Sequence, residues 1–277
     1  KERDLFQHPN KEYSKVQIIR IHETQLFDEH NGDTFMTVDQ AIDWSEAMWP
    51  DAHDSSFIDL ITSGVAYELI NSGKEYVFIS NVDNRAATME PALLAIMELT
   101  GNPLLNEVSL NVGQPGGAPV KLNKVLFKYM TGLLEVWNMD PKFLKSLSQD
   151  ETKAYLPLFN TANYCINILE YVKDVFLRPI KPNATDADAK YLLRQFYDAR
   201  GNPEKRAELK FKLLEVHYRF VSQFWETDKR YPAVQPSNST GIHTWFAKTT
   251  FVEVPQGEIA GAASRFEPQK ENLDNLE

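Results

Sequence analysis

Residues 74–84, KEYVFISNVDN, decide the fold class of this chain. The run at 75–80 is apolar and rich in aromatic and β-branched residues, which predicts a buried strand. It ends abruptly in the polar residues Ser80, Asn81, Asp83 and Asn84. One interpretation is an ordinary turn, because Asn and Asp stabilise turns through side-chain to backbone hydrogen bonds, and composition alone favours it. The other is a ligand site, since α/β sheets bind ligands just beyond the carboxyl ends of their strands.

Helical patterns flank this strand on both sides. Residues 55–74 carry apolar side chains at helical spacing, and Gly73 is placed to end a single helix there. Residues 90–102 predict a second helix, which Pro91 begins and Gly101 ends. Helix and strand alternating at this interval indicate βαβ units. We therefore expect an α/β fold with a mixed, mostly parallel sheet.

The remaining patterns indicate one α/β body with a helical interruption. Further strands are expected at 15–22, 107–114, 132–140 and 244–254, with a Gly-rich turn at 113–119. Residues 179–190 have the composition of a linker, 202–226 form an amphipathic helical pattern, and 230–241 read as a loop. The predicted division is an α/β core at 1–178, a linker and amphipathic helical insertion at 179–240, and a return to the core at 241–277.

Composition excludes several classes of protein. The chain has 277 residues, of which 43% are apolar and 25% charged, as in globular proteins. A formal net charge of −10 argues against a nucleic-acid groove. No run of 18 apolar residues predicts a membrane span, and the first residues are charged rather than signal-like. Cys165 is the only cysteine, so no intrachain disulfide can form. We expect an acidic cytoplasmic protein, since such cysteine usage favours a reducing compartment.

Five stretches, taken in order, resemble one family. They are MWPDAHDSSFIDLITSGVAYELINSGKEYVFISNVDNRAATMEP, GQPGGAPVKLN, LLEVWNMDP, LFNTANYCINIL and SRFEPQKENLDNL. The first resembles the turn, helix and Ser-Asn-x-Asp-Asn strand end of the UTP–sugar-1-phosphate uridylyltransferases, in particular the UDP-glucose pyrophosphorylase-like members. The others are similar to that family's Gly-Gly turn, Glu-bearing strand, Asn-Thr-x-Asn segment and Phe-x-Pro-x-Lys pattern. Any one piece is unspecific, whereas five in the same order are specific. The resemblance implies a nucleotide-diphosphosugar transferase-like fold, Rossmann-like and three-layered.

The resemblance also implies a reaction. A sugar-1-phosphate oxygen joins the α-phosphorus of UTP, and pyrophosphate leaves. Two polyanions must meet, so positioning and charge neutralisation carry most of the catalysis. Magnesium prefers one or two carboxylates together with phosphate oxygens. The resemblance assigns this Mg²⁺ to Asp83, and the competing interpretation is a turn carboxylate. Glucose-1-phosphate is expected before the N-acetylglucosamine analogue.

The resemblance gives the other site residues their expected roles. Lys270 would supply a cation to the phosphates, and the alternative is a solvated lysine. His53 would contact the nucleotide-sugar, or else cap a helix or face solvent. Sugar hydroxyls would be bound by Asn81, Asn163 and Glu135, with a backbone approach at Gly116 and Gly117. Asn163 could equally cap a helix, and the glycines could form a plain hairpin turn.

The chain departs from the family pattern in ways that leave a second function open. The family's Gly-rich phosphate loop does not occur in these residues, and Ala52 and Asp54 stand where Gly is usual. One interpretation is the substrate-binding and metal-binding part of a longer transferase. The alternative is a catalytically inactive nucleotide-sugar-binding, regulatory or structural homologue. The helical pattern near 203–226 is a candidate surface for a protein partner or oligomer.

Overall fold

The computed structural model describes the chain in several ranges. They are 55–81, 84, 86–111, 116–121, 131–135, 142, 156–217, 223–226, 233–237, 240–256 and 265–266, with short strands at 23–25, 27–28 and 48–50. The predicted strand at 15–22 lies outside the described residues. No helix in these ranges is long and apolar enough to cross a membrane.

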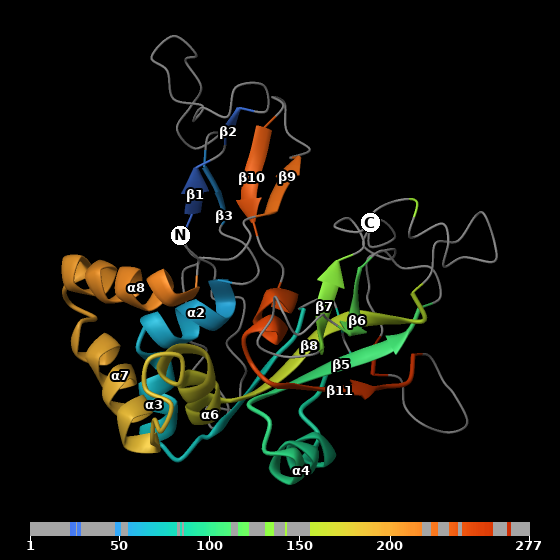
Figure 1. The fold of residues 1–277 in the computed structure, drawn as a ribbon, viewed down its shortest axis with the longest axis horizontal. Helices are drawn as coiled ribbons and strands as arrows, with labels where there is room; N and C mark the ends of the chain where they lie inside the picture. Colours follow the sequence, from blue (N-terminus) through green and yellow to red (C-terminus); the bar gives the residue numbers. More distant parts are fainter. Residues whose placement is uncertain are drawn as a thin grey trace, which may run out of the picture.

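A four-stranded sheet forms the centre of the described fold (Figure 1). Its order is β11 (Thr249–Glu253), β5 (Leu104–Leu110), β8 (Leu158–Asn167) and β4 (Tyr76–Ile79). β11 pairs parallel with β5, while β8 runs antiparallel to both β5 and β4. The sheet is therefore mixed, as expected, but only one of its three pairings is parallel, because the antiparallel β8 lies between β5 and β4. β8 itself was not predicted as a strand.

The βαβ unit around the opening motif is confirmed. β4 is followed by α4 (Pro91–Thr100) and then by β5. Pro91 occupies the first turn of α4, and Gly101 ends the helix in the left-handed region at φ 61°. Leu93 and Met97 of α4 pack in a cluster with Leu105 and Cys165 of the sheet. In Figure 1 this helix lies apart from the other helices.

The single helix expected at 55–74 is wrong, because two helices occupy that stretch. α2 (Ser55–Thr62) and α3 (Val65–Asn71) are separated at Gly64, whose φ is 79°. A Cβ atom at Gly64 would lie 2.8 Å from both the Tyr197 Cα and the Arg200 Nε. Arg200 also donates from Nε to the Ser63 carbonyl at 2.7 Å. The chain bends here so that a later helix can approach its backbone, and only Gly accommodates both demands.

That later helix is α7 (Asp186–Asp198), which begins inside the stretch predicted as a linker. A capping box starts it: the Thr185 hydroxyl accepts from the Asp188 amide, and the Asp188 carboxylate accepts from the Thr185 amide. Ala189, Leu193 and Phe196 are fully buried in the same hydrophobic cluster as α2. The helix is therefore packed into the main core.

The helix expected at 202–226 is correct at its start and wrong at its end. α8 (Pro203–His217) opens with the Asn202 side chain accepting from the Lys205 amide at 2.9 Å. Residues of its predicted last turns instead form β9 (Gln223–Glu226). β9 pairs with β10 (Ala233–Ser237), inside the expected loop, and β10 also pairs with β2 (Phe27–Asp28). Aromatic residues such as Phe224 and Trp225 suit strands, so an available partner strand overrides the helical pattern.

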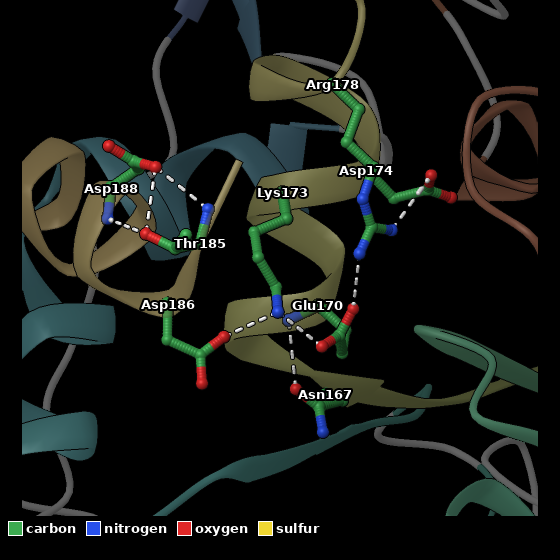
Figure 2. A network of polar contacts seen from close by, with 8 residues as sticks. All are labelled: Asn167, Glu170, Lys173, Asp174, Arg178, Thr185, Asp186 and Asp188. Carbon is green, nitrogen blue, oxygen red and sulfur yellow. Dashed lines mark hydrogen bonds and ion pairs between the residues drawn. The ribbon is translucent and has the colours of Figure 1, made fainter. Parts of the chain in front are cut away.

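A polar network connects α6 (Ile168–Val172) to the start of α7 (Figure 2). The chain continues from α6 into a π-helix, η3 (Lys173–Leu177). The Lys173 ammonium lies 2.5 Å from both the Glu170 and the Asp186 carboxylates. Burial lowers the pKa of Lys173, but these two hydrogen bonds outweigh burial and leave its pKa raised. Arg178 completes the network through Glu170 at 3.0 Å.

Two strand pairs lie outside the central sheet. β6 (Gly117–Lys121) pairs antiparallel with β7 (Thr131–Glu135), and β1 (Glu23–Gln25) pairs with β3 (Met48–Pro50). The 3-10 helix η4 (Thr240–Trp245) lies along β7, because the Leu133 amide donates to the Thr244 hydroxyl and its carbonyl accepts from the Trp245 indole. β6 begins at Gly117, within the residues expected to form the Gly-rich turn.

Tyr171→Phe should destabilise the core. The Tyr171 hydroxyl and His243 Nδ1 share a hydrogen bond of 2.6 Å, and both residues are buried. His243 also stacks on Phe57 with ring centroids 4.1 Å apart. Loss of the hydroxyl should cost about 1–3 kcal/mol of the free energy of unfolding, because a buried polar atom loses its partner. Thermal denaturation should show this as a lower Tm. Tyr191→Phe, at an exposed position of α7, is the control and should leave the Tm unchanged.

Asp188→Asn should remove one part of the pH dependence of stability. Hydrogen bonds from Lys181 and then from Thr185 lower the pKa of Asp188 to about 2. Because the folded-state pKa is depressed, this stabilisation is present above the unfolded pKa of about 3.9 and disappears as the pH falls toward 2. The Tm difference between the original chain and the variant should therefore be constant above pH ~5 and shrink toward pH ~2. A difference that stays the same throughout would contradict this role.

Candidate functional site

A β-bulge between β5 and β8 gathers polar side chains at one place in the sheet. Glu107 lies opposite Asn163, whereas the next residue of β5 lies opposite Asn160. Thr161 and Ala162 are therefore extra residues on β8. Ala162 adopts φ 60°, and its amide donates to the Asn160 side chain at 2.9 Å. The predicted Asn-Thr-x-Asn segment is thus a bulged strand, and bulges commonly re-aim side chains near functional sites.

Asn163 lies inside the protein at this bulge. Its side chain donates from Nδ2 to the Glu107 Oε2 at 2.7 Å, and its Oδ1 accepts from the Asn84 Nδ2 at 3.3 Å. Asn163 has no exposed surface. It does not cap a helix, so that alternative is wrong. Its expected hydrogen bond to a sugar hydroxyl stays a prediction.

Glu107 and Arg265 form an ion pair that the sequence did not predict, in which the carboxylate is fully buried and the guanidinium is partly buried. Glu107 is fully buried on β5. Arg265 donates to its Oε1 from Nε at 2.8 Å and from Nη2 at 2.6 Å. A signal was available: a Glu within a predicted buried strand requires a nearby cation, since charged residues are almost never fully buried unless paired. The sequence did not indicate which cation, because the two residues are 158 positions apart.

Arg265 also binds the loop that follows β4. Its Nη2 donates to the Thr88 carbonyl at 2.6 Å, and its Nη1 lies 3.4 Å from the Glu90 carboxylate. Its own carbonyl accepts from the Asn84 Nδ2 at 3.2 Å, and its amide donates to the Pro255 carbonyl at 3.0 Å. The residue is therefore fixed through both its main chain and its side chain.

The two glycines and the glutamate predicted around the sugar come together. Gly117 and Glu135 are paired neighbours on β6 and β7. A Cβ atom at Gly117 would lie 2.8 Å from the Glu135 Oε2, so the carboxylate packs directly over the glycine. A Cβ atom at Gly116 would meet the Phe159 ring at 3.9 Å, and that ring contacts Phe266 at a centroid distance of 4.9 Å. The Gly-Gly turn, the bulged strand and the Phe-x-Pro-x-Lys segment therefore adjoin one another.

Asn81 belongs to the polar end of the stretch at 74–84, for which a turn and a ligand site were the two interpretations. It is exposed just beyond β4, and its carbonyl accepts from the Asn84 amide at 3.1 Å. This bond between residues i and i+3 is the one that the turn interpretation predicts, and the ligand role expected for Asp83 stays a prediction. Asn84 nevertheless enters the buried network through Asn163 and Arg265. The polar end of the strand therefore contributes Asn84 to the candidate site.

Three predicted site residues, Asp83, His53 and Lys270, lie outside the described residues. Within the described ranges no three His, Cys, Asp or Glu side chains are grouped to hold a metal ion. The Mg²⁺ expected at Asp83 needs no such group, because magnesium is commonly held by one or two carboxylates, substrate phosphates and water.

Cys165 is unsuited to nucleophilic chemistry. Burial, with a contribution from the Glu107 charge, raises the pKa of its thiol to about 12. A thiol becomes nucleophilic as the thiolate, so Cys165 is inert at neutral pH.

Curated proteins that resemble this chain carry the same enzyme name. The curated proteins that are similar over part of the chain include the following two. A UTP–glucose-1-phosphate uridylyltransferase 2 of Dictyostelium discoideum is 28% identical over 56% of this chain and 30% of its own length. A UTP–glucose-1-phosphate uridylyltransferase of Encephalitozoon cuniculi is 32% identical over 46% and 25%. The chain therefore spans about a quarter to a third of these relatives.

Solved structures share the fold. A UDP-glucose pyrophosphorylase of Leishmania major, an L281D mutant in complex with UDP-glucose, superimposes with a TM-score of 0.57 at 19% identity, covering 90% of this chain and 45% of that one. A UDP-glucose phosphorylase from Trypanosoma brucei gives 0.55 at 18% identity, covering 86% and 45%. These matches confirm the nucleotide-diphosphosugar transferase-like fold.

A family model covers more than half of the chain. The model for UTP–glucose-1-phosphate uridylyltransferase matches residues 4–184, which include the opening stretch, both glycines, Glu135 and the bulge. This chain therefore belongs to the UTP–glucose-1-phosphate uridylyltransferase family.

Proposed function

We propose that this chain forms the sugar-binding and metal-binding part of an enzyme that joins UTP and glucose-1-phosphate to give UDP-glucose and pyrophosphate. One observation carries the proposal. Segments that are far apart in the sequence, and that each carry a piece of the family pattern, adjoin one another: the turn at 81–84, the Gly117–Glu135 pair, the bulge at 160–163 and Arg265–Phe266.

The described residues suit the recognition of a hexose. Gly117 has no side chain, so the Glu135 carboxylate packs directly against the β6 backbone and is held in one position. Hydrogen bonds from Glu135, Asn81 and Asn163 to sugar hydroxyls would discriminate strongly, since a wrong sugar leaves such groups unpaired. Glucose is the proposed sugar because the relatives named above use glucose-1-phosphate.

The reaction also requires that the negative charge of the phosphates be neutralised. The glucose-1-phosphate oxygen forms a bond to the α-phosphorus of UTP, and the bond to the pyrophosphate oxygen breaks. In this acidic chain the Arg265 guanidinium is already paired with Glu107. We therefore assign the phosphate charge to Lys270 and Asp83, the latter holding Mg²⁺, with His53 against the nucleotide. Bound Mg²⁺ would neutralise charge that develops on the phosphate oxygens.

The setting of the reaction belongs to the same proposal. We place it in the cytoplasm, with UTP, glucose-1-phosphate and UDP-glucose as partners. A protein partner or second copy on the surface near 203–226 remains a proposal, for which the exposed Phe211 of α8 offers an apolar contact. The alternative function, nucleotide-sugar binding without catalysis, is favoured by Ala52 and Asp54 at positions where the family pattern has Gly.

Pyrophosphate release tests the proposed function. The chain should release pyrophosphate from UTP and glucose-1-phosphate only when Mg²⁺ is present, and Asp83→Ala should abolish turnover because it removes the metal carboxylate. Asp198→Ala, which changes an exposed carboxylate on α7, is the matched control and should keep its activity.

Thermal stability separates the two candidate functions. A ligand that binds only the folded state raises its Tm. A Tm increase with UDP-glucose but no turnover would favour the non-catalytic alternative. If the chain shows no turnover and UDP-glucose does not raise its Tm, the substrate site is rejected.

Gly117→Ala should weaken sugar binding. The added methyl group would lie 2.8 Å from the Glu135 Oε2, which must then move away from its position over the backbone. We expect KM for glucose-1-phosphate to rise about 10-fold or more, the usual effect of one misplaced methyl-sized group in a pocket. Gly201→Ala adds the same methyl group where nothing lies within 4 Å and serves as the control. An unchanged KM in Gly117→Ala would place the sugar elsewhere.

A further inference from the structure

A single buried network joins four separate segments of the chain. Glu107 on β5 accepts from Arg265 through Oε1 and from Asn163 on β8 through Oε2. Asn163 accepts from Asn84, and Asn84 also donates to the Arg265 carbonyl. The hydrogen bonds therefore close into a ring of four residues, in which each residue contacts two others.

An ion pair of this kind adds little to the free energy of unfolding compared with apolar residues of similar size. A buried ion pair is weak evidence for stabilisation, because removing two charges from water offsets much of their attraction, and apolar residues of similar size often replace such pairs without loss. Directional hydrogen bonds, in contrast, fix geometry. Both oxygens of Glu107 are occupied by different segments, so a shift of either segment breaks a short contact of 2.6–2.8 Å.

In the sequence, the network adjoins both residues to which the proposed reaction assigns charge. Asn84 directly follows Asp83, and the Asn84 amide is held in the turn by the Asn81 carbonyl. Arg265 precedes Lys270 by five positions, and Phe266 between them rests on Phe159 of β8. Asn84, which follows Asp83, and Arg265, which precedes Lys270, are therefore hydrogen-bonded to each other.

We propose that Glu107 and Arg265 are positioning residues for uridylyl transfer, acting through Asn163 and Asn84 to hold residue 84, which follows Asp83 in the sequence, and residues 265–266, which precede Lys270, in one fixed relation. This inference rests on the proposed function. Neither residue needs to touch the substrate. Their contribution is to spacing, and a misplacement of about 1 Å in a catalytic group can cost roughly 100-fold in rate.

Two conservative variants test the proposal. Arg265→Lys keeps the positive charge but cannot reproduce the donation from both Nε and Nη2. Glu107→Gln keeps the shape but removes the charge. Both variants should fold and should lose about 100-fold in kcat, with little change in KM for glucose-1-phosphate, because spacing matters in the transition state. Tyr171→Phe is the control for destabilisation: its Tm should fall while its kcat stays close to that of the unmodified chain.

Hydrogen exchange supplies a readout that does not depend on activity. Peptides covering 81–88 and 263–270 should both exchange faster in Arg265→Lys and in Glu107→Gln, since one network holds both segments. Both should be unchanged in Tyr171→Phe. Folded variants that keep their kcat, or exchange that rises in only one of the two peptides, would overturn the proposal.

The two proposals can fail separately. An unmodified chain without turnover and without a UDP-glucose effect on Tm overturns the proposed function and, with it, a catalytic role for the ion pair. In that case joint exchange of the two peptides would still support their coupling through Glu107 and Arg265, whereas independent exchange would overturn the coupling as well.

Discussion

A fully buried carboxylate in the central sheet, Glu107, sets the main constraint on this structure. An unpaired charge in a protein interior is so costly that the fold must bring a cation to it. The cation, Arg265, comes from a segment beyond the π-helix and beyond α7 and α8. The path of the chain through these elements must therefore bring Arg265 back to Glu107 on β5. The bulge in β8 follows from the same constraint, since it places Asn163 where the second Glu107 oxygen needs a donor.

The parts of the fold that could be predicted are those with strong local signals. β4 and α4 follow from an apolar run, an initial proline and a final glycine, and no tertiary contact opposes these signals. The predictions failed where a distant partner decides the outcome. The helix at 55–74 divides because α7 packs against Gly64, and the pattern at 202–226 ends early because β10 offers a partner to β9. β8 was missed because its Asn-rich sequence does not resemble a strand, although its backbone pairs on both sides.

Some residues of the candidate site could be chosen from the sequence, whereas the contacts between them could not. Gly117 and Glu135 were chosen separately from the family resemblance, and the structure places one over the other. Asn163 was chosen for a sugar hydroxyl, and the structure gives its amide two protein partners. A sequence shows that a polar residue is present but does not show which group it faces. Arg265 could not be identified because its role depends on a partner 158 positions away.

The long sequence separation within the network has a consequence for how the chain folds. Contacts between residues close in sequence form quickly, whereas closing a loop of more than a hundred residues is slow and costs more chain entropy. During synthesis, β5 leaves the ribosome well before Arg265 does. Until Arg265 has been synthesised, Glu107 has no access to this cation, so the ion pair is a late contact in the formation of the chain.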